Sequence, residues 1–198
     1  MKSIFVALGT VALFSGCAYQ GHVASTSAGY EVRPDRVSKG KAYVYVTQDV
    51  ATLEKTVKPG FICSAHSYPL EAGTALKSSI IKTMEAAYKD VIPVTSVGAA
   101  GKDGPLYSFS LDEFTPRLRF AQGFWTGTAD ATVEIAFKTA AIEPSGKDMA
   151  RTTVRGFGQD SQEGTCDVGA QALTTAAEKA IRVALENFVG KVINPAAP

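Results

Sequence analysis

Residues 125–142 show the pattern that most restricts the fold, because apolar and polar side chains alternate along the stretch. The apolar positions are Ala129, Ala131, Val133, Ile135 and Phe137. The positions between them are Thr128, Asp130, Thr132, Glu134, Ala136 and Lys138. This period of two predicts a β-strand with one buried face and one mainly polar face. Residues 144–147 predict a turn, and residues 149–157 are expected to return as the hairpin partner.

Two other segments repeat their apolar residues at three- and four-residue steps, which is typical of an amphipathic helix. The first begins at Pro69, a residue suited to a first helical turn, and ends at Ile92-Pro93. Its apolar positions are Leu76, Ile80, Met84, Ala87, Tyr88 and Val91. The second covers residues 167–192, where Asp167 is expected to cap the helix and abundant alanine favours close packing against a sheet.

The remaining strands are predicted from aromatic and β-branched residues. Residues 41–47 predict a central strand, and residues 106–114 predict another that Thr115-Pro116 bends or interrupts. Residues 156–158, which read Gly-Phe-Gly, predict a bulge or turn, and the polar residues 159–164 predict a loop.

This order of elements predicts an α+β fold: an antiparallel (mixed) sheet with two helices packed on one face. A chain of 198 residues suits one domain, which we place at residues 41–194. Residues 17–40 are rich in Ser, Gly, Thr and Ala without an apolar period, so we expect a flexible tether. His22, within it, is expected to be solvated.

The N-terminus reads as a secretory signal, because a basic start precedes a short apolar run in residues 1–16. Phe14-Ser15-Gly16-Cys17 resembles a bacterial lipobox. That resemblance implies cleavage after Gly16 and fatty acids attached at Cys17, and Ala18 after the cysteine favours the outer membrane, facing the periplasm. The alternative is an ordinary signal peptide in which the cysteine occurs by chance.

Cys63 and Cys166 are the two remaining cysteines, and in an oxidising compartment such a pair usually forms a disulfide. The bridge would join the N-terminal ends of the two helices and set them side by side and roughly parallel. Two free buried thiols are the alternative. A Cys63/His66 nucleophilic pair is a further one, whereas the absence of CxxC and the presence of only two histidines argue against a metal site.

Residues 114–125 mix aromatic residues with two arginines around a proline and a glycine. In the structural interpretation this is a long connection or irregular hairpin whose aromatic side chains partly fill the core. In the functional interpretation it is a protruding surface for a partner protein or for lipid headgroups, because exposed aromatics with arginine are typical of binding hot spots. The candidate binding residues are Arg117, Arg119, Phe120, Phe124 and Trp125.

Several functional classes find no support in the sequence. The formal net charge is +1 without long charged runs, so no nucleic-acid partner is expected. No GxSxG, HExxH, P-loop or GxGxxG motif occurs. We therefore expect no catalytic residues, no cofactor, no metal and no enzymatic activity.

The lipobox, the strand from Tyr107, and residues 128–137, 151–158 and 170–189 together resemble small Gram-negative periplasmic lipoproteins. The plan is that of YajG-like lipoproteins, of auxiliary lipoproteins of ABC-type lipid transport systems and of lipopolysaccharide-assembly lipoproteins. The resemblance implies a lipid-anchored, non-enzymatic binding or assembly module with an envelope protein partner, in lipid or polysaccharide transport. A thiol-dependent or hydrolytic envelope enzyme centred on Cys63 and His66, and a purely structural envelope protein, remain as alternatives.

Overall fold

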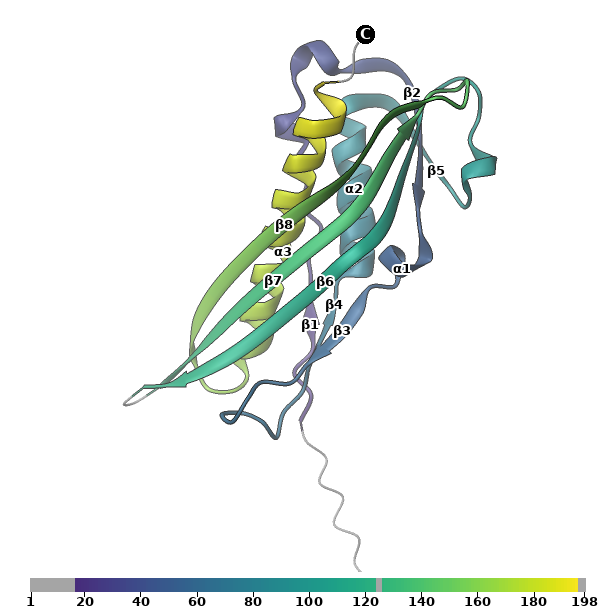
Figure 1. The fold of residues 1–198 in the computed structure, drawn as a ribbon. Coiled ribbons are helices and arrows are strands. Elements are labelled where there is room, and N and C mark those ends of the chain that lie inside the picture. Colours follow the sequence, from purple (N-terminus) through teal and green to yellow (C-terminus); the bar gives the residue numbers. More distant parts are fainter. Residues whose placement is uncertain (1–16, 124–125, 196–198) are drawn as a thin grey trace, which may run out of the picture.

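The computed structural model describes residues 17–123 and 126–195 (Figure 1). The strands are β1 Gly21–His22, β2 Ser38–Val46, β3 Glu54–Val57, β4 Tyr68–Glu71, β5 Tyr88–Val94, β6 Leu106–Gln122, β7 Gly127–Ile142 and β8 Asp148–Gly164. The helices are α1 Gln48–Ala51, α2 Gly73–Ala87 and α3 Val168–Phe188, and a π-helical turn, Val189–Ile193, continues α3. In the described residues no helix is long and apolar enough to cross a lipid bilayer.

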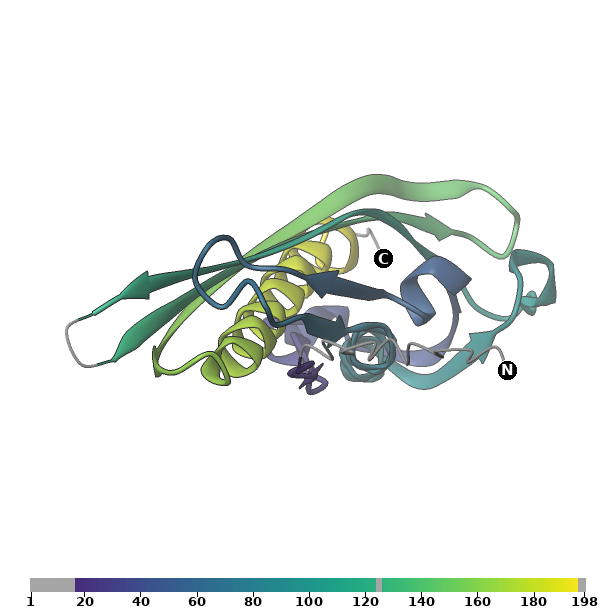
Figure 2. The ribbon, with the colours of Figure 1, turned by 90° about the horizontal axis from the view of Figure 1, so that it is seen from below.

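Five strands form the main sheet in the order β5-β2-β6-β7-β8, and a smaller sheet has the order β1-β4-β3. Strand β2 runs parallel to β5 and β6, whereas β6, β7 and β8 are antiparallel. The predicted α+β class and mixed sheet are therefore confirmed, as is the interior position of β2. Seen from below, α2 and α3 lie on one side of the long strands (Figure 2).

The alternation in β7 places its apolar residues in the core, as predicted. Ala129, Ala131, Val133, Ile135 and Phe137 are all buried, and the α3 stripe from Leu173 to Phe188 packs into the same cluster. Burying this apolar surface stabilises the fold at roughly 25 cal/mol for each Å² removed from water. This shared core holds the long strands in a fixed position against the helix.

Helix α3 lies very close to β8 because two strand residues are glycines. A Cβ atom at Gly156 would lie 1.9 Å from the Ala180 carbonyl oxygen, and one at Gly158 would lie 2.0 Å from that of Ala176. The expected bulge or turn at residues 156–158 was wrong, as was the loop at residues 159–164. Strand β8 continues to Gly164 because its residues stay paired with β7 to that point.

The first predicted helix was too long at both ends. Pro69 lies in β4, and α2 begins only at Gly73. Tyr88 and Val91 belong to β5, which pairs in parallel with β2. This strand tolerates Pro93 because it lies at the edge of the sheet, where a missing N–H group leaves no neighbour unpaired.

Strand β6 passes through Thr115-Pro116 without interruption. Pro116 pairs in register with Val133 of β7. On the other side β2 borders β6 only from Leu106 to Phe109, so Pro116 lies where no strand of this sheet would need its N–H group. The proline therefore does not break the strand.

The predicted flexible tether is instead ordered along the two helices. The backbone N–H groups of Thr26 and Ala28 donate hydrogen bonds to the hydroxyls of Ser79 and Thr83, at 2.9 and 3.1 Å. Ala28 is fully buried. The prediction for residues 17–40 was wrong because acceptors on α2, rather than an apolar period, hold this segment.

Candidate functional site

Cys63 and Cys166 form the predicted disulfide, with 5.7 Å between their Cα atoms. The bridge joins the start of α3 to the loop before β4, not to the N-terminus of α2 as predicted, because β4 lies between Cys63 and that helix. Both α2 and α3 nevertheless run away from this end of the molecule (Figure 1). We refer to it as the disulfide end.

The disulfide removes the free thiol that a Cys63/His66 centre would need. The His66 ring packs beside Tyr19, with the ring centroids 5.2 Å apart. Tyr68 donates a hydrogen bond of 2.7 Å to the Cys166 carbonyl oxygen. Burial raises the pKa of Tyr68 to about 12, so its phenol keeps this proton at neutral pH. The ring contact of His66 and the hydrogen bond of Tyr68 therefore stabilise the chain next to the disulfide.

Asp167 occupies the N-cap position of α3, as predicted, but makes no capping hydrogen bond with its side chain. Its carboxylate accepts a hydrogen bond from the Thr165 hydroxyl instead. This hydrogen bond lowers the pKa of Asp167. The local Thr165 contact thus replaces the expected cap.

Cys17, the residue predicted to be lipidated, is exposed and carries a free thiol. Its carbonyl oxygen accepts a hydrogen bond of 3.4 Å from the N–H group of Ser67, and Tyr19 donates one of 2.9 Å to the Ser67 carbonyl. Ser67 belongs to the connection between Cys63 and β4. Cys17 therefore lies at the disulfide end, attached to the chain beside the bridge.

A groove of about 490 Å³ lies between the distal part of β6 and the loop at residues 57–62. Arg117, Arg119 and Phe120, three of the candidate binding residues, line it from β6. The other two candidates, Phe124 and Trp125, lie outside the described residues. The chain therefore brings part of the predicted surface to a concave site at the disulfide end.

The two interpretations of residues 114–125 apply to different side chains. Phe120 is partly buried, and its ring packs against Tyr68 with the centroids 5.9 Å apart, as in the structural interpretation. Arg117 and Arg119 are exposed, as the functional interpretation requires. Because side chains alternate along a strand, β6 uses its two faces for these two purposes.

The opposite wall of the groove was not predicted from the sequence. Lys58 lines it, and Phe61 is 99% exposed, which is unusual for an aromatic residue. The sequence Lys58-Pro59-Gly60, which is typical of a turn, was the available signal, since a turn brings the residues beside it to the surface. This sequence alone did not indicate that the loop would face β6, because the two segments are far apart along the chain.

The groove has a positive charge without acidic residues in its lining. Its charged lining residues are Lys58, Arg117 and Arg119. Within the described part of the chain none of the three takes part in an ion pair. An anionic group is therefore the chemistry that this site would bind.

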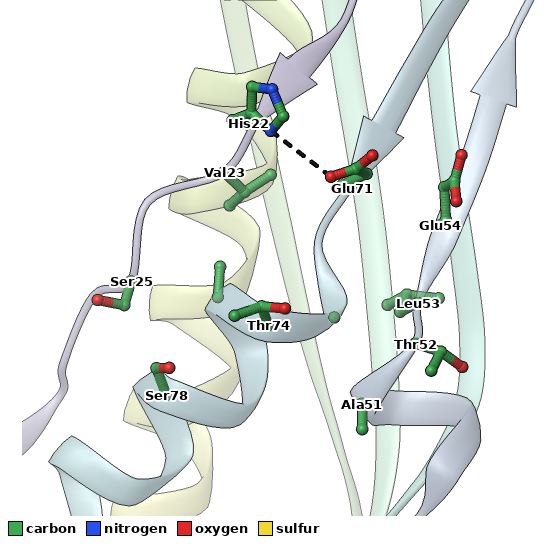
Figure 3. A pocket seen from close by; sticks show the side chains of 12 residues that line it. His22, Val23, Ser25, Ala51, Thr52, Leu53, Glu54, Glu71, Thr74 and Ser78 are labelled. Atoms are coloured by element: carbon green, nitrogen blue, oxygen red, sulfur yellow. Dashed lines mark ion pairs between the residues drawn. The ribbon is translucent and has the colours of Figure 1, made fainter.

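A second hollow, of about 600 Å³, lies beside β1, β4 and the start of α2 (Figure 3). The Nδ1 atom of His22 lies 3.5 Å from a carboxylate oxygen of Glu71, and Glu54 faces Glu71 across the β3–β4 pair. The side chains of His22 and Glu71 are largely exposed, so their ion pair is worth little. No cluster of three or more metal-binding side chains occurs among the described residues.

The sequence matches no known family and no curated protein. Among solved structures, a minor lipoprotein from Acinetobacter baumannii is 11% identical, with a TM-score of 0.30, over 75% of this chain and 92% of that one. A neuraminyllactose-binding hemagglutinin homolog from Helicobacter pylori is 8% identical, with a TM-score of 0.33, over 75% of this chain and 86% of that one. Neither likeness is strong enough to assign a shared fold or function.

Proposed function

We propose that this chain is an outer-membrane lipoprotein, anchored through Cys17 and facing the periplasm, that acts as a non-enzymatic binding or assembly module. Its partner would be an envelope protein, in the lipid or polysaccharide transport that the resemblance to YajG-like and related lipoproteins implies. The observation that carries the proposal is the position of Cys17, which is exposed at the end of the molecule where the cationic groove lies.

The lipid anchor is supported by the sequence around Cys17 and by the exposure of its thiol. A lipobox requires this sulfur to receive a diacylglyceryl group, and an exposed position leaves room for it. Each buried methylene of an acyl chain contributes roughly 0.8 kcal/mol, so several chains give stable attachment. In this proposal the lipid anchor sets the location of the protein, and the groove binds the partner.

A binding role is favoured over catalysis by the chemistry of the groove. It combines exposed cations with Phe61, which is the composition of a contact surface. The one nucleophile that the sequence suggested, Cys63, is bonded to Cys166. A hydrolytic role would need another centre, and the exposed His22–Glu71 pair lacks the buried surroundings that tune catalytic groups.

The anchor is tested by mass spectrometry of the mature protein from Gram-negative cells fed labelled palmitate. We expect an N-terminal Cys17 carrying fatty acids, and recovery of the protein with the outer membrane. The Cys17→Ser variant should carry no label. A mature N-terminus at another residue, without fatty acid, would contradict the proposed address.

The binding role is tested separately by cross-linking in intact envelopes. A defined envelope protein should be recovered with the wild-type chain and lost with Arg117→Glu plus Arg119→Glu. Arg151→Glu is the matched control, because Arg151 is an exposed arginine that lies on β8 and pairs with Asp148 at 3.0 Å. Equal recovery with all three chains would remove the groove from the proposal.

A further inference from the structure

On the side away from β7, the distal half of β6 pairs with no other strand among the described residues. Pairing with β2 ends at Phe109, whereas pairing with β7 continues to Gln122. In the described residues no hydrogen bond from outside β7 reaches the backbone of Leu118 or Phe120. An edge of this kind is a template for another extended chain.

One contact shows which backbone groups face this edge. The Nζ atom of Lys55 donates a hydrogen bond of 3.1 Å to the carbonyl oxygen of Phe114. That carbonyl therefore points away from β7. Alternate residues of a strand direct their backbone groups to the same side, and the register is regular beyond the bulge at residues 111–113. Leu118 and Phe120 thus offer N–H and C=O groups to the open edge.

The groove lies along this edge, since Leu118 and Phe120 line it opposite the loop at residues 57–62. Its charge favours an acidic occupant, because Lys58, Arg117 and Arg119 line it and no acidic residue does. Pro116 has no N–H group to donate, so it limits the length of strand that can be added. A short acidic segment, held by charge as well as by backbone hydrogen bonds, fits the open edge, the positive lining and the limit that Pro116 sets.

We infer that this groove binds an acidic, extended peptide segment of a partner protein, which adds as a strand to β6 at Leu118 and Phe120. The segment's carboxylates would contact Lys58, Arg117 and Arg119, and an apolar side chain would pack on Phe61. Backbone bonds give such complexes affinity, and side-chain contacts give them specificity. The inference deepens the proposed binding role, but it does not depend on the lipid at Cys17.

An anionic bilayer surface is the competing occupant, because it offers the same charge. The concave shape and the backbone groups at the edge favour a peptide, since a flat headgroup layer cannot form the alternating bonds of a strand pair. An assay with both an acidic peptide and anionic vesicles separates the two occupants.

Binding is measured by fluorescence anisotropy on the full chain carrying Cys17→Ser, so that no lipid contributes. The probe is a labelled short peptide in which glutamate alternates with valine. One comparison peptide has lysine in place of glutamate, and two others have N-methyl groups on alternate backbone nitrogens in the two possible registers, each of which blocks one edge of the peptide. We expect saturable binding of the first peptide and of one N-methylated register, and none of the lysine peptide or of the other register.

The variant Arg117→Glu with Arg119→Glu should weaken the binding by about tenfold or more, since like charges then face each other. Arg151→Glu should leave it unchanged, and equal melting temperatures should show that both variants are folded. Equal binding of every N-methylated register would overturn strand addition. Binding to phosphatidylglycerol vesicles without binding to the peptide would overturn the peptide as the occupant.

The lipid analysis keeps this result separate from the proposed address. A chain without fatty acid that still binds the peptide would contradict the anchor and support the groove. A lipidated chain that binds no acidic peptide in any register would contradict the groove and leave the anchor in place.

Discussion

The edges of the main sheet at β8 and at the distal half of β6 are protected differently. Along β8, Lys179 of α3 donates a hydrogen bond of 3.0 Å to the Gln159 carbonyl, and Asn187 donates one of 2.8 Å to that of Arg155. Along distal β6, Lys55 reaches only the Phe114 carbonyl. Side chains of a helix can occupy the free backbone groups of a strand edge that the helix lies beside. A strand edge that borders a groove instead keeps these groups available for binding.

The largest expected effect is the loss of the disulfide, which ties the loop that faces β6 to α3. We expect Cys63→Ala with Cys166→Ala to lower the free energy of unfolding by about 4–5 kcal/mol, because the closed loop is about 100 residues long. Denaturant unfolding measures this difference, and Cys17→Ser is the control without effect. A loss below about 1 kcal/mol would show that the loop is held without the bridge.

A substitution at Gly158 tests the β8 edge, where α3 lies close to the strand. Gly158→Ala should lower the free energy of unfolding by about 3 kcal/mol, because the new methyl group would collide with the α3 backbone. Gly98→Ala is the matched control, since no heavy atom lies within 4 Å of its added Cβ. Similar melting temperatures for the two variants would contradict the close packing of α3 against β8.

Removing the two side chains that close β8 should make its edge resemble that of β6. We expect Lys179→Met with Asn187→Leu to cost about 1–2 kcal/mol, since the edge carbonyls lose their donors. The variant should also associate as its concentration rises, which analytical ultracentrifugation would detect. Lys77→Met on α2 is the control, and a strictly monomeric double variant would show that the edge is protected by other means.

The smallest effect is on the pH dependence of the β8 edge. Burial raises the pKa of Asp160, but hydrogen bonds from Lys179 and Gln162 outweigh it, so this pKa lies below its usual range. The contribution to stability is therefore present at neutral pH and is lost as the pH falls through the pKa of the folded state. Asp160→Asn should flatten the acid side of a plot of unfolding free energy against pH.

The sequence predicted elements whose apolar period survives in the fold, such as β7 and α3. It failed where a distant contact decides the local structure. Pro116 stays within a strand because β2 has already ended, and residues 159–164 stay extended because β7 is there to pair with them. Arg117 and Arg119 were visible as candidates, but Phe61 was not, since only the folded chain brings its loop to face β6.

Hydrogen bonds fix residues 18–28 to the domain, so almost no flexible chain separates Cys17 from the folded body. An acyl group on that sulfur would hold the folded body directly against the lipid headgroups. The disulfide end would face the membrane, without a long linker between them. The protein's reach into the surrounding space would then be set by the length of its own strands.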